Sequence, residues 1–214
     1  MVSGARIRGG ERKAERDHER ENRHRAYEDF AAVARDLVAT GVTTPERLGC
    51  KGGSNGGLLT GAMLPMYPDL FGAVVIQVPL LDMRRYTKLL AGASWAAEYG
   101  DPDDPEQWEY IRTFSPYHLV RHDTAYPPVL LTTSTRDDRV HPGHARKMTA
   151  LLESVAADVT YVENIEGGHG GAADNAQAAH MSANRGRPLP TAFFVGLASH
   201  IFTDATIHPL VYYL

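Results

Sequence analysis

Apolar positions along this chain recur in two different patterns, short continuous runs and longer segments with helical spacing. Phe30, Val33 and Leu37 lie three or four residues apart, and this spacing predicts an amphipathic helix over residues 27–39 that lies on a sheet. Residues 73–78 are almost entirely apolar, which is typical of a strand buried on both faces. The two patterns together indicate helices packed on a sheet.

The same alternation continues along most of the chain. Short apolar runs that end at turn residues predict strands, and the longer segments between them predict helices. The expected strands are 47–50, 73–78, 128–134 and 159–164, and the expected helices are 27–39, 57–66, 142–155 and 172–182. Strands that alternate with helices predict an α/β fold with a mostly parallel sheet flanked by helices.

One serine lies in a glycine-rich turn between an expected strand and an expected helix. Residues 50–57 have the sequence CKGGSNGG, with Ser54 inside the pattern Gly-x-Ser-x-Gly. A sharp strand-to-helix turn needs small residues beside the serine, because a Cβ there collides with the backbone, and the turn exposes the serine Oγ. Ser54 is therefore the candidate nucleophile, although Gly-Ser clusters also form ordinary flexible turns.

A carboxylate and a histidine follow Ser54 along the chain. Asp137 and Asp138 come after the strand expected at 128–134, and His169 lies among glycines after the strand expected at 159–164. Serine, carboxylate and histidine occur in this chain order in α/β-hydrolases. Ligands bind at the carboxyl ends of the strands in open parallel sheets, so the three side chains are expected to meet there. The pattern leaves Asp137 and Asp138 both open as the carboxylate.

Five segments in chain order carry a family resemblance. They are 52–57 (GGSNGG), 69–72 (DLFG), 95–100 (WAAEYG), 137–140 (DDRV) and 168–170 (GHG). Together they resemble the catalytic domain of the prolyl oligopeptidase family of serine peptidases, over about residues 21–184. Complete members of that family carry a β-propeller and the first strands of the hydrolase sheet upstream, so the resemblance implies a partial α/β-hydrolase fold that contains the later strands.

This resemblance divides the chain into three expected parts. Residues 1–25 form a poorly ordered lead-in that is dense in charges of both signs, residues 26–184 form the prolyl oligopeptidase-like catalytic part, and residues 185–214 form an atypical helical tail. Loss of the upstream strands is expected to leave one edge of the strand at 47–50 unpaired.

The resemblance also implies a role for each candidate site residue. Ser54 is the nucleophile, His169 the general base and Asp137 the carboxylate that orients it, while Asp138 orients the loop. The resemblance implies that the backbone N–H of Asn55 binds the oxyanion. It implies that Trp95 stacks on a substrate proline, that Tyr99 lines the same pocket and that Arg139 binds a substrate carbonyl. The apolar Leu80 and Val140 complete the substrate-binding residues.

Simpler interpretations exist for several of these residues. Without the resemblance, Trp95 and Tyr99 are more readily interpreted as core aromatics that share one helix face. Leu80 and Val140 would be core residues, and Arg139 would form a surface ion pair with one of the neighbouring aspartates. The family's second oxyanion donor, a tyrosine hydroxyl, belongs to a part of the domain upstream of the resemblance.

Composition narrows the classes of partner. The chain has 214 residues, a net charge of −4 and one cysteine, Cys50. This charge does not favour nucleic acid as a ligand, no apolar run is long enough to span a membrane, and no signal peptide is visible. A lone cysteine fits a reducing, cytoplasmic location. We therefore expect a soluble protein whose partner is a peptide, containing proline, and whose chemistry needs no cofactor; the sequence does not determine the oligomeric state.

The carboxy-terminal tail carries a weak metal pattern. His200, Asp204 and His208 are four residues apart, so a helix would align them on one face with chemistry suited to zinc. The tail resembles a piece of bacterial zinc-dependent phospholipase C-like proteins. Three such residues on their own more often form a polar helix face, and the sequence assigns no metal.

Three functions remain open from the sequence. The first is a serine peptidase that cleaves on the carboxyl side of proline through an acyl-enzyme. The second is an inactive truncated or chimeric fragment that retains the triad. The third is an esterase or acylaminoacyl hydrolase, since the same fold and triad serve several bonds.

Overall fold

A five-stranded parallel sheet forms the centre of the computed structural model, which describes residues 22–170 and the backbone of residues 193–196. The strand order is β4-β3-β2-β1-β5. The strands are β1 (Leu48–Gly53), β2 (Ala73–Gln77), β3 (Val129–Ser134), β4 (Val159–Asn164) and β5 (Phe193–Gly196).

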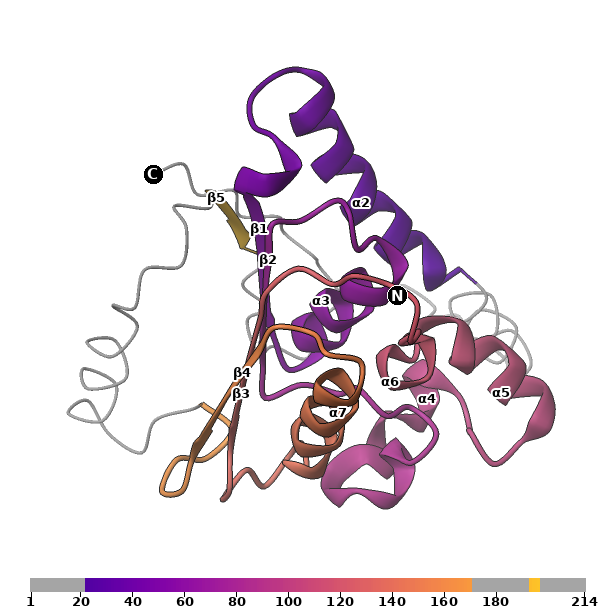
Figure 1. Cartoon of the computed structure of the whole chain (residues 1–214). Helices are drawn as coiled ribbons and strands as arrows, with labels where there is room; N and C mark the ends of the chain where they lie inside the picture. The colour runs from indigo at the N-terminus through magenta and orange to yellow at the C-terminus, as the bar shows by residue number, and fades with distance from the viewer. Residues whose placement is uncertain (1–21, 171–192, 197–214) are drawn as a thin grey trace, which may run out of the picture.

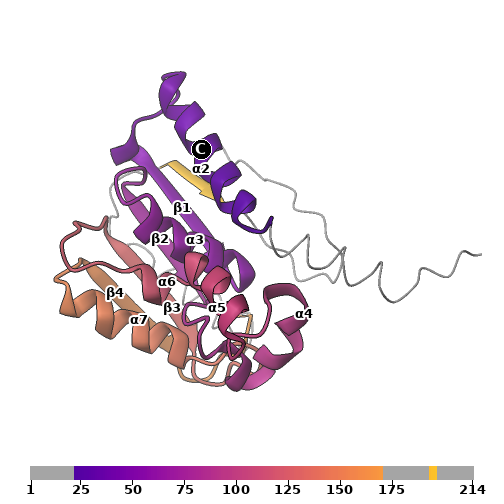
Figure 2. The same cartoon turned by 90° about the vertical axis from the view of Figure 1, so that its right-hand side faces the viewer.

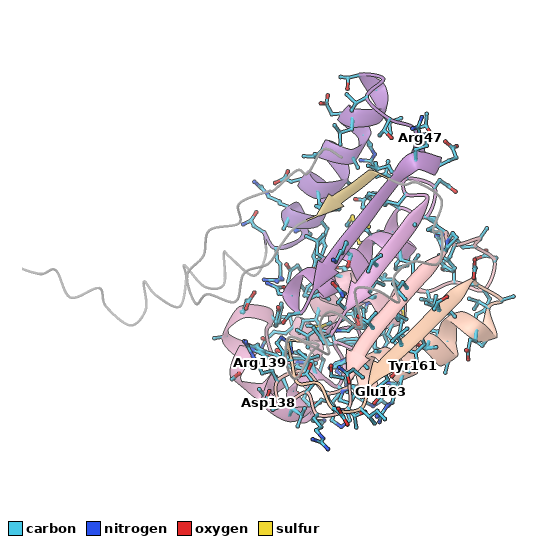
Figure 3. The ribbon with its side chains drawn as sticks, turned by 90° about the vertical axis from the view of Figure 1, so that its left-hand side faces the viewer. Arg47, Asp138, Arg139, Tyr161 and Glu163 are labelled. Carbon is cyan, nitrogen blue, oxygen red and sulfur yellow. The ribbon has the colours of Figure 1, made fainter. Side chains whose placement is uncertain are left out.

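The described helices cover one face of this sheet (Figure 1). They are α2 (His24–Ala39), α3 (Asn55–Met66), α4 (Ala96–Tyr99), α5 (Pro105–Ile111), α6 (Pro116–Leu119) and α7 (Gly143–Ser154), with 3₁₀ turns η1 (Pro45–Arg47), η2 (Tyr86–Lys88), η3 (Leu90–Trp95) and η4 (Arg112–Phe114). Viewed from the helix side, α3 lies on β1 and β2, and α7 lies on β3 and β4 (Figure 2). Within the described residues, the opposite face carries no helix (Figure 3).

The predicted α/β fold with a parallel sheet is confirmed, and its elements lie close to their expected positions. The boundaries differ most at the start of α2, which begins at His24 rather than residue 27, and at the serine turn. The strand expected at 47–50 continues to Gly53 because Gly52 and Gly53 remain in register with Ile76 and Gln77 of β2. The strand-to-helix turn is therefore the single residue Ser54. The helix expected at 172–182 lies outside the described residues.

The outer edge of β1 differs from the expectation. β5 pairs with β1 in parallel, from Leu48 opposite Phe193 to Lys51 opposite Gly196, so this stretch of the edge is not unpaired. The helical tail expected at 185–214 is likewise a strand where it is described, since aromatic and β-branched residues at 193–196 favour extended backbone beside an open edge. The rest of that tail lies outside the described residues.

The core lies between the sheet and its helices. Strand residues Cys50, Ile76 and Leu131 are fully buried beneath Leu58 of α3 and Met148 of α7. Burial raises the pKa of the Cys50 thiol, so this cysteine is an inert apolar side chain rather than a reactive one.

A buried histidine joins α7 to the segment that follows β2. His144 Nδ1 accepts hydrogen bonds from the backbone N–H of Asp82, at 3.0 Å, and of Leu81, at 3.3 Å. An imidazole nitrogen that accepts must be unprotonated, so the ring is neutral. Burial, with a smaller effect of the nearby cation Lys147 and of His141, lowers the pKa of His144 from 6.5 to about 4, although the Asp82 carboxylate opposes this shift.

This geometry predicts an acid-dependent loss of stability. The unfolded chain binds a proton at His144 near pH 6.5 while the folded chain resists it until about pH 4, so the stabilisation is present above pH 6.5 and is lost as pH falls toward 4. At pH 5 the loss is about 2 kcal/mol in the free energy of unfolding. Urea unfolding at pH 8 and pH 5 measures it. His144→Gln should reduce the difference in unfolding free energy between pH 8 and pH 5, and the exposed control His122→Gln should not. An equal pH dependence in both variants would contradict the assignment of this loss to His144.

Candidate active site

Ser54 forms the whole turn between β1 and α3, and its backbone is strained. Its φ of 57° and ψ of −116° lie in a region that residues with a side chain rarely adopt, at a cost of about 1–3 kcal/mol. The turn is held by hydrogen bonds from Ser54 N–H to the Gln77 carbonyl, at 2.9 Å, and from Leu58 N–H to the Ser54 carbonyl, at 3.1 Å.

Glycine is required beside this turn because the backbone is crowded. A Cβ at Gly52 would lie 2.1 Å from the carbonyl oxygen of Gly56, and a Cβ at Gly57 would lie 2.8 Å from that of Gln77. A Cβ at Gly53 would have ordinary contacts, at 3.7 Å or more. The crowding thus falls on Gly52 and Gly57, not on every glycine of the motif.

The structure brings Ser54, His169 and Asp137 into one hydrogen-bonded chain. Nε2 of His169 lies 3.0 Å from Ser54 Oγ, and Nδ1 lies 2.8 Å and 3.0 Å from the two carboxylate oxygens of Asp137. Because the carboxylate can only accept, Nδ1 carries the proton and Nε2 is free to accept from the serine hydroxyl. The side chain of His169 is 6% exposed.

Asp137 and Asp138, which the sequence left as rivals, have different surroundings. The Asp137 side chain is fully buried, and its Oδ1 accepts from the backbone N–H of Arg139 and of Val140, at 2.9 Å and 2.8 Å. Burial alone would raise the pKa of Asp137, but the hydrogen bonds from His169 and these two N–H groups outweigh it, and the pKa is lowered. Asp138 is exposed at the carboxyl end of the sheet, opposite the end that carries Arg47 (Figure 3).

Two of the expected pocket residues contact each other directly. The Tyr99 hydroxyl donates to Oδ1 of Asn55 at 2.9 Å, and Tyr99 is only 2% exposed, so burial raises its pKa. Trp95 is half-buried at the end of η3 and Tyr99 closes α4. The two aromatics therefore lie on successive short elements rather than on one continuous helix.

The other pocket candidates lie at the ends of neighbouring strands. Leu80 follows β2 and is 3% exposed, while Val140 follows β3 and is 2% exposed. Arg139 is half-buried (Figure 3). Among the described residues, its guanidinium has no carboxylate partner, so the surface ion pair suggested by the sequence is not formed there.

Arg23 is a neighbour of the site that the sequence analysis assigned to the charged lead-in. Its guanidinium donates to Asn55 Oδ1 at 2.9 Å, pairs with Glu98 at 2.7 Å, and lies 4.2 Å from the centre of the Tyr99 ring. The many charges around it in sequence concealed this role. The sequence offered two weak signals, since Arg23 lies within the stretch 21–184 that resembles the family and shortly before the helix expected at 27–39.

The described residues contain neither a metal-binding cluster nor a helix that could span a membrane. Residues 22–170, with the short strand at 193–196, contain no cluster of side chains that could hold a metal ion. The candidates His200, Asp204 and His208 lie outside the described residues. None of the helices described is both long and apolar enough to cross a membrane.

A parallel sheet with serine, aspartate and histidine side chains beyond the ends of three strands is the arrangement found in the α/β-hydrolase fold. The prolyl oligopeptidase family matches this chain over residues 2–185, and the chain belongs to that family. The match begins within the charged lead-in, so the family relationship extends further toward the amino terminus than the sequence motifs indicated. It ends before residue 200, and the resemblance of the tail to phospholipase C-like proteins has no support.

Named relatives place the match within longer proteins. The chain is 54% identical over 173 residues to the uncharacterized peptidase y4nA of Sinorhizobium fredii, covering 79% of this chain and 24% of that protein. It is 39% identical over 155 residues to a prolyl endopeptidase of Elizabethkingia miricola, covering 71% and 22%. A solved structure of a post-proline cleaving enzyme from Rickettsia typhi matches with 42% identity and a TM-score of 0.68, covering 70% and 22%. The chain thus spans about a quarter of the length of these relatives.

Proposed function

We propose that this chain carries the catalytic site of a serine peptidase that cleaves peptides on the carboxyl side of proline. The observation that supports it most strongly is the hydrogen-bonded chain Ser54–His169–Asp137. Membership of a family of serine peptidases supports the reaction class.

In this proposal His169 moves the proton. A serine hydroxyl is a weak nucleophile, so His169 Nε2 takes the proton from Ser54 Oγ as the oxygen attacks the substrate carbonyl. Asp137 holds the ring with its proton on Nδ1 and stabilises the imidazolium that forms. His169 then gives its proton to the leaving amine, and water releases the acyl group by the same steps.

The oxyanion formed by attack is stabilised at the start of α3. The first N–H groups of a helix have no partner within it and lie at the positive end of the helix dipole. Asn55 is the first residue of α3, so its N–H is the donor nearest Ser54 in sequence. One such donor contributes about a hundred- to a thousandfold in rate.

Selectivity for proline is supported by the pocket residues and by the relatives. The half-buried Trp95 offers an aromatic ring to a proline, and the half-buried guanidinium of Arg139 suits a substrate carbonyl. Tyr99, Leu80 and Val140 are buried. The Rickettsia typhi relative is named for cleavage after proline.

The test is covalent labelling of the chain with a small alkyl fluorophosphonate. The activated Ser54 should react, and Ser54→Ala should abolish labelling. Ser94→Ala, at an exposed serine whose Oγ bonds the Ala91 carbonyl, is the matched control and should label like the parent. Equal labelling of the parent and Ser54→Ala would refute the proposal, and no labelling of either would favour an inactive fragment.

A second measurement determines which bond is cleaved, a peptide bond after proline or an ester. Chromogenic Gly-Pro and Gly-Ala amides and a simple aryl ester are compared as substrates of the chain, and of a protein that includes the upstream part found in its relatives. Faster cleavage of the Gly-Pro amide supports proline selectivity. Fast ester cleavage without a preference for proline would instead favour an esterase.

A further inference from the structure

Arg23 connects three segments that are distant in sequence but adjacent to the candidate nucleophile. It lies at the start of α2, its Nη2 donates to Asn55 at the start of α3, and its Nη1 pairs with Glu98 in α4. Its side chain is 19% exposed. A surface ion pair would need only Glu98, so the second bond, to the residue after the nucleophile, requires another explanation.

The contacts around Asn55 fix the orientation of its side-chain amide. A guanidinium can only donate, so the Asn55 atom that lies 2.9 Å from Arg23 must be the carbonyl oxygen Oδ1. The Tyr99 hydroxyl donates to the same oxygen. With Oδ1 held by two donors, the Nδ2 group is directed away from Arg23 and Tyr99, and none of the described residues accepts a bond from it.

The same guanidinium also holds one wall of the expected pocket. It stacks 4.2 Å from the centre of the Tyr99 ring, while the edge of the Tyr86 ring contacts Tyr99 with centroids 5.6 Å apart. Tyr99 is thus held by Arg23 on its ring, by Asn55 at its hydroxyl and by Tyr86 at its side. Loss of Arg23 would remove one of the three contacts that hold Tyr99 and one of the two donors that hold the Asn55 amide.

We propose that Arg23 is a positioning residue that sets substrate selectivity by fixing Asn55 and Tyr99 beside Ser54. This inference rests on the proposed peptidase function. Arg23 does not touch the reacting atoms; it holds the Asn55 amide in the orientation that presents Nδ2 to an acyl group, and it keeps the Tyr99 ring against the proline pocket. Its charge is balanced by Glu98, so it fixes geometry without adding net charge to the site.

The experiment compares two labels on the same chain. One is the small fluorophosphonate, which needs only Ser54 and its activation, and the other is an acyl-prolyl diphenyl phosphonate, which must also fill the pocket. Arg23→Gln should slow the prolyl label about tenfold to a hundredfold, because misplacement of about 1 Å has effects of that size, while the small label changes less than threefold. Arg25→Ala, on the same turn of α2 and exposed, is the control and should change neither rate.

A double-mutant cycle tests whether Arg23 acts through Asn55. Asn55→Ala keeps the backbone N–H but removes the amide, so the double variant should react with the prolyl label no more slowly than the slower single variant. Additive losses, or an equal loss for both labels, would overturn the proposal and leave Arg23 a structural ion pair. If Arg23→Gln does not fold, Arg23→Lys, which keeps the charge, is measured in its place. If neither variant folds, Asn55→Ala is measured alone. The proposal is then overturned if the ratio of the two labelling rates equals that of the parent.

The outcomes also separate this inference from the proposed function. If Ser54→Ala and the parent label equally, the peptidase proposal fails. If Ser54 labels normally but the Arg23 variants keep the parent's ratio of the two rates, only the positioning role fails.

Discussion

Asp137→Asn is expected to slow labelling of Ser54 by a fluorophosphonate by about four orders of magnitude, the loss that this substitution causes in the best-studied serine, histidine and aspartate triad. The amide presents an N–H toward His169 in place of an acceptor. To accept that bond, Nδ1 must give up its proton, which moves to Nε2. The nitrogen 3.0 Å from Ser54 Oγ is then a donor and cannot take the serine proton.

Asp138→Asn is the matched control for this experiment. The two aspartates are adjacent, yet Asp138 is exposed and Asp137 is the carboxylate that His169 contacts. We expect Asp138→Asn to label within about twofold of the parent, since an exposed charge has little effect on a neighbouring reaction. A large loss from Asp138→Asn with little from Asp137→Asn would exchange the roles of the two residues.

Gly52→Ala is expected to reduce labelling of Ser54 about a hundredfold and to lower the free energy of unfolding by about 1–3 kcal/mol. The new methyl group would lie 2.1 Å from the Gly56 carbonyl oxygen, which belongs to the first turn of α3. Backbone cannot rotate away as a side chain can, so the start of the helix must shift, and with it Ser54 and the N–H of Asn55.

Gly53→Ala tests whether the effect comes from this one contact. A Cβ at Gly53 meets Gln77 atoms only at 3.7 Å and 3.8 Å, which is ordinary contact. We expect Gly53→Ala to label like the parent and to unfold at a similar urea concentration. Labelling rates and urea midpoints are measured for both variants, and equal losses would show that the turn needs small residues in general.

The sequence predicted the parts of the fold that depend on local pattern. Apolar runs located β1 to β4, and helical spacing located α2. The helices α3 and α7 were expected because longer segments separate those strands. That Ser54, Asp137 and His169 lie together could also be anticipated, since carboxyl ends of parallel strands share one edge. Their catalytic roles stay predictions.

The remaining features depend on contacts that no local pattern records. Arg23 is one of many charged residues near the amino terminus, and only the fold brings its guanidinium to Asn55 and Glu98. Trp95 and Tyr99 have helical spacing but lie on two short elements, because η3 ends at Trp95 before α4 begins. The pairing of β5 with β1 joins residues far apart in sequence, which periodicity cannot report.

That pairing affects how the chain folds. Gly49 meets Ala73 after a single crossover through α3, whereas Leu48 meets Phe193 only after most of the chain has been made. Closing the longer loop costs about 1.5 kcal/mol more in chain entropy than closing the shorter one, and contacts between distant residues slow folding. The strand β1, which precedes Ser54, therefore pairs with β2 before it can pair with β5. During synthesis, β5 can pair with β1 only after residue 193 has left the ribosome.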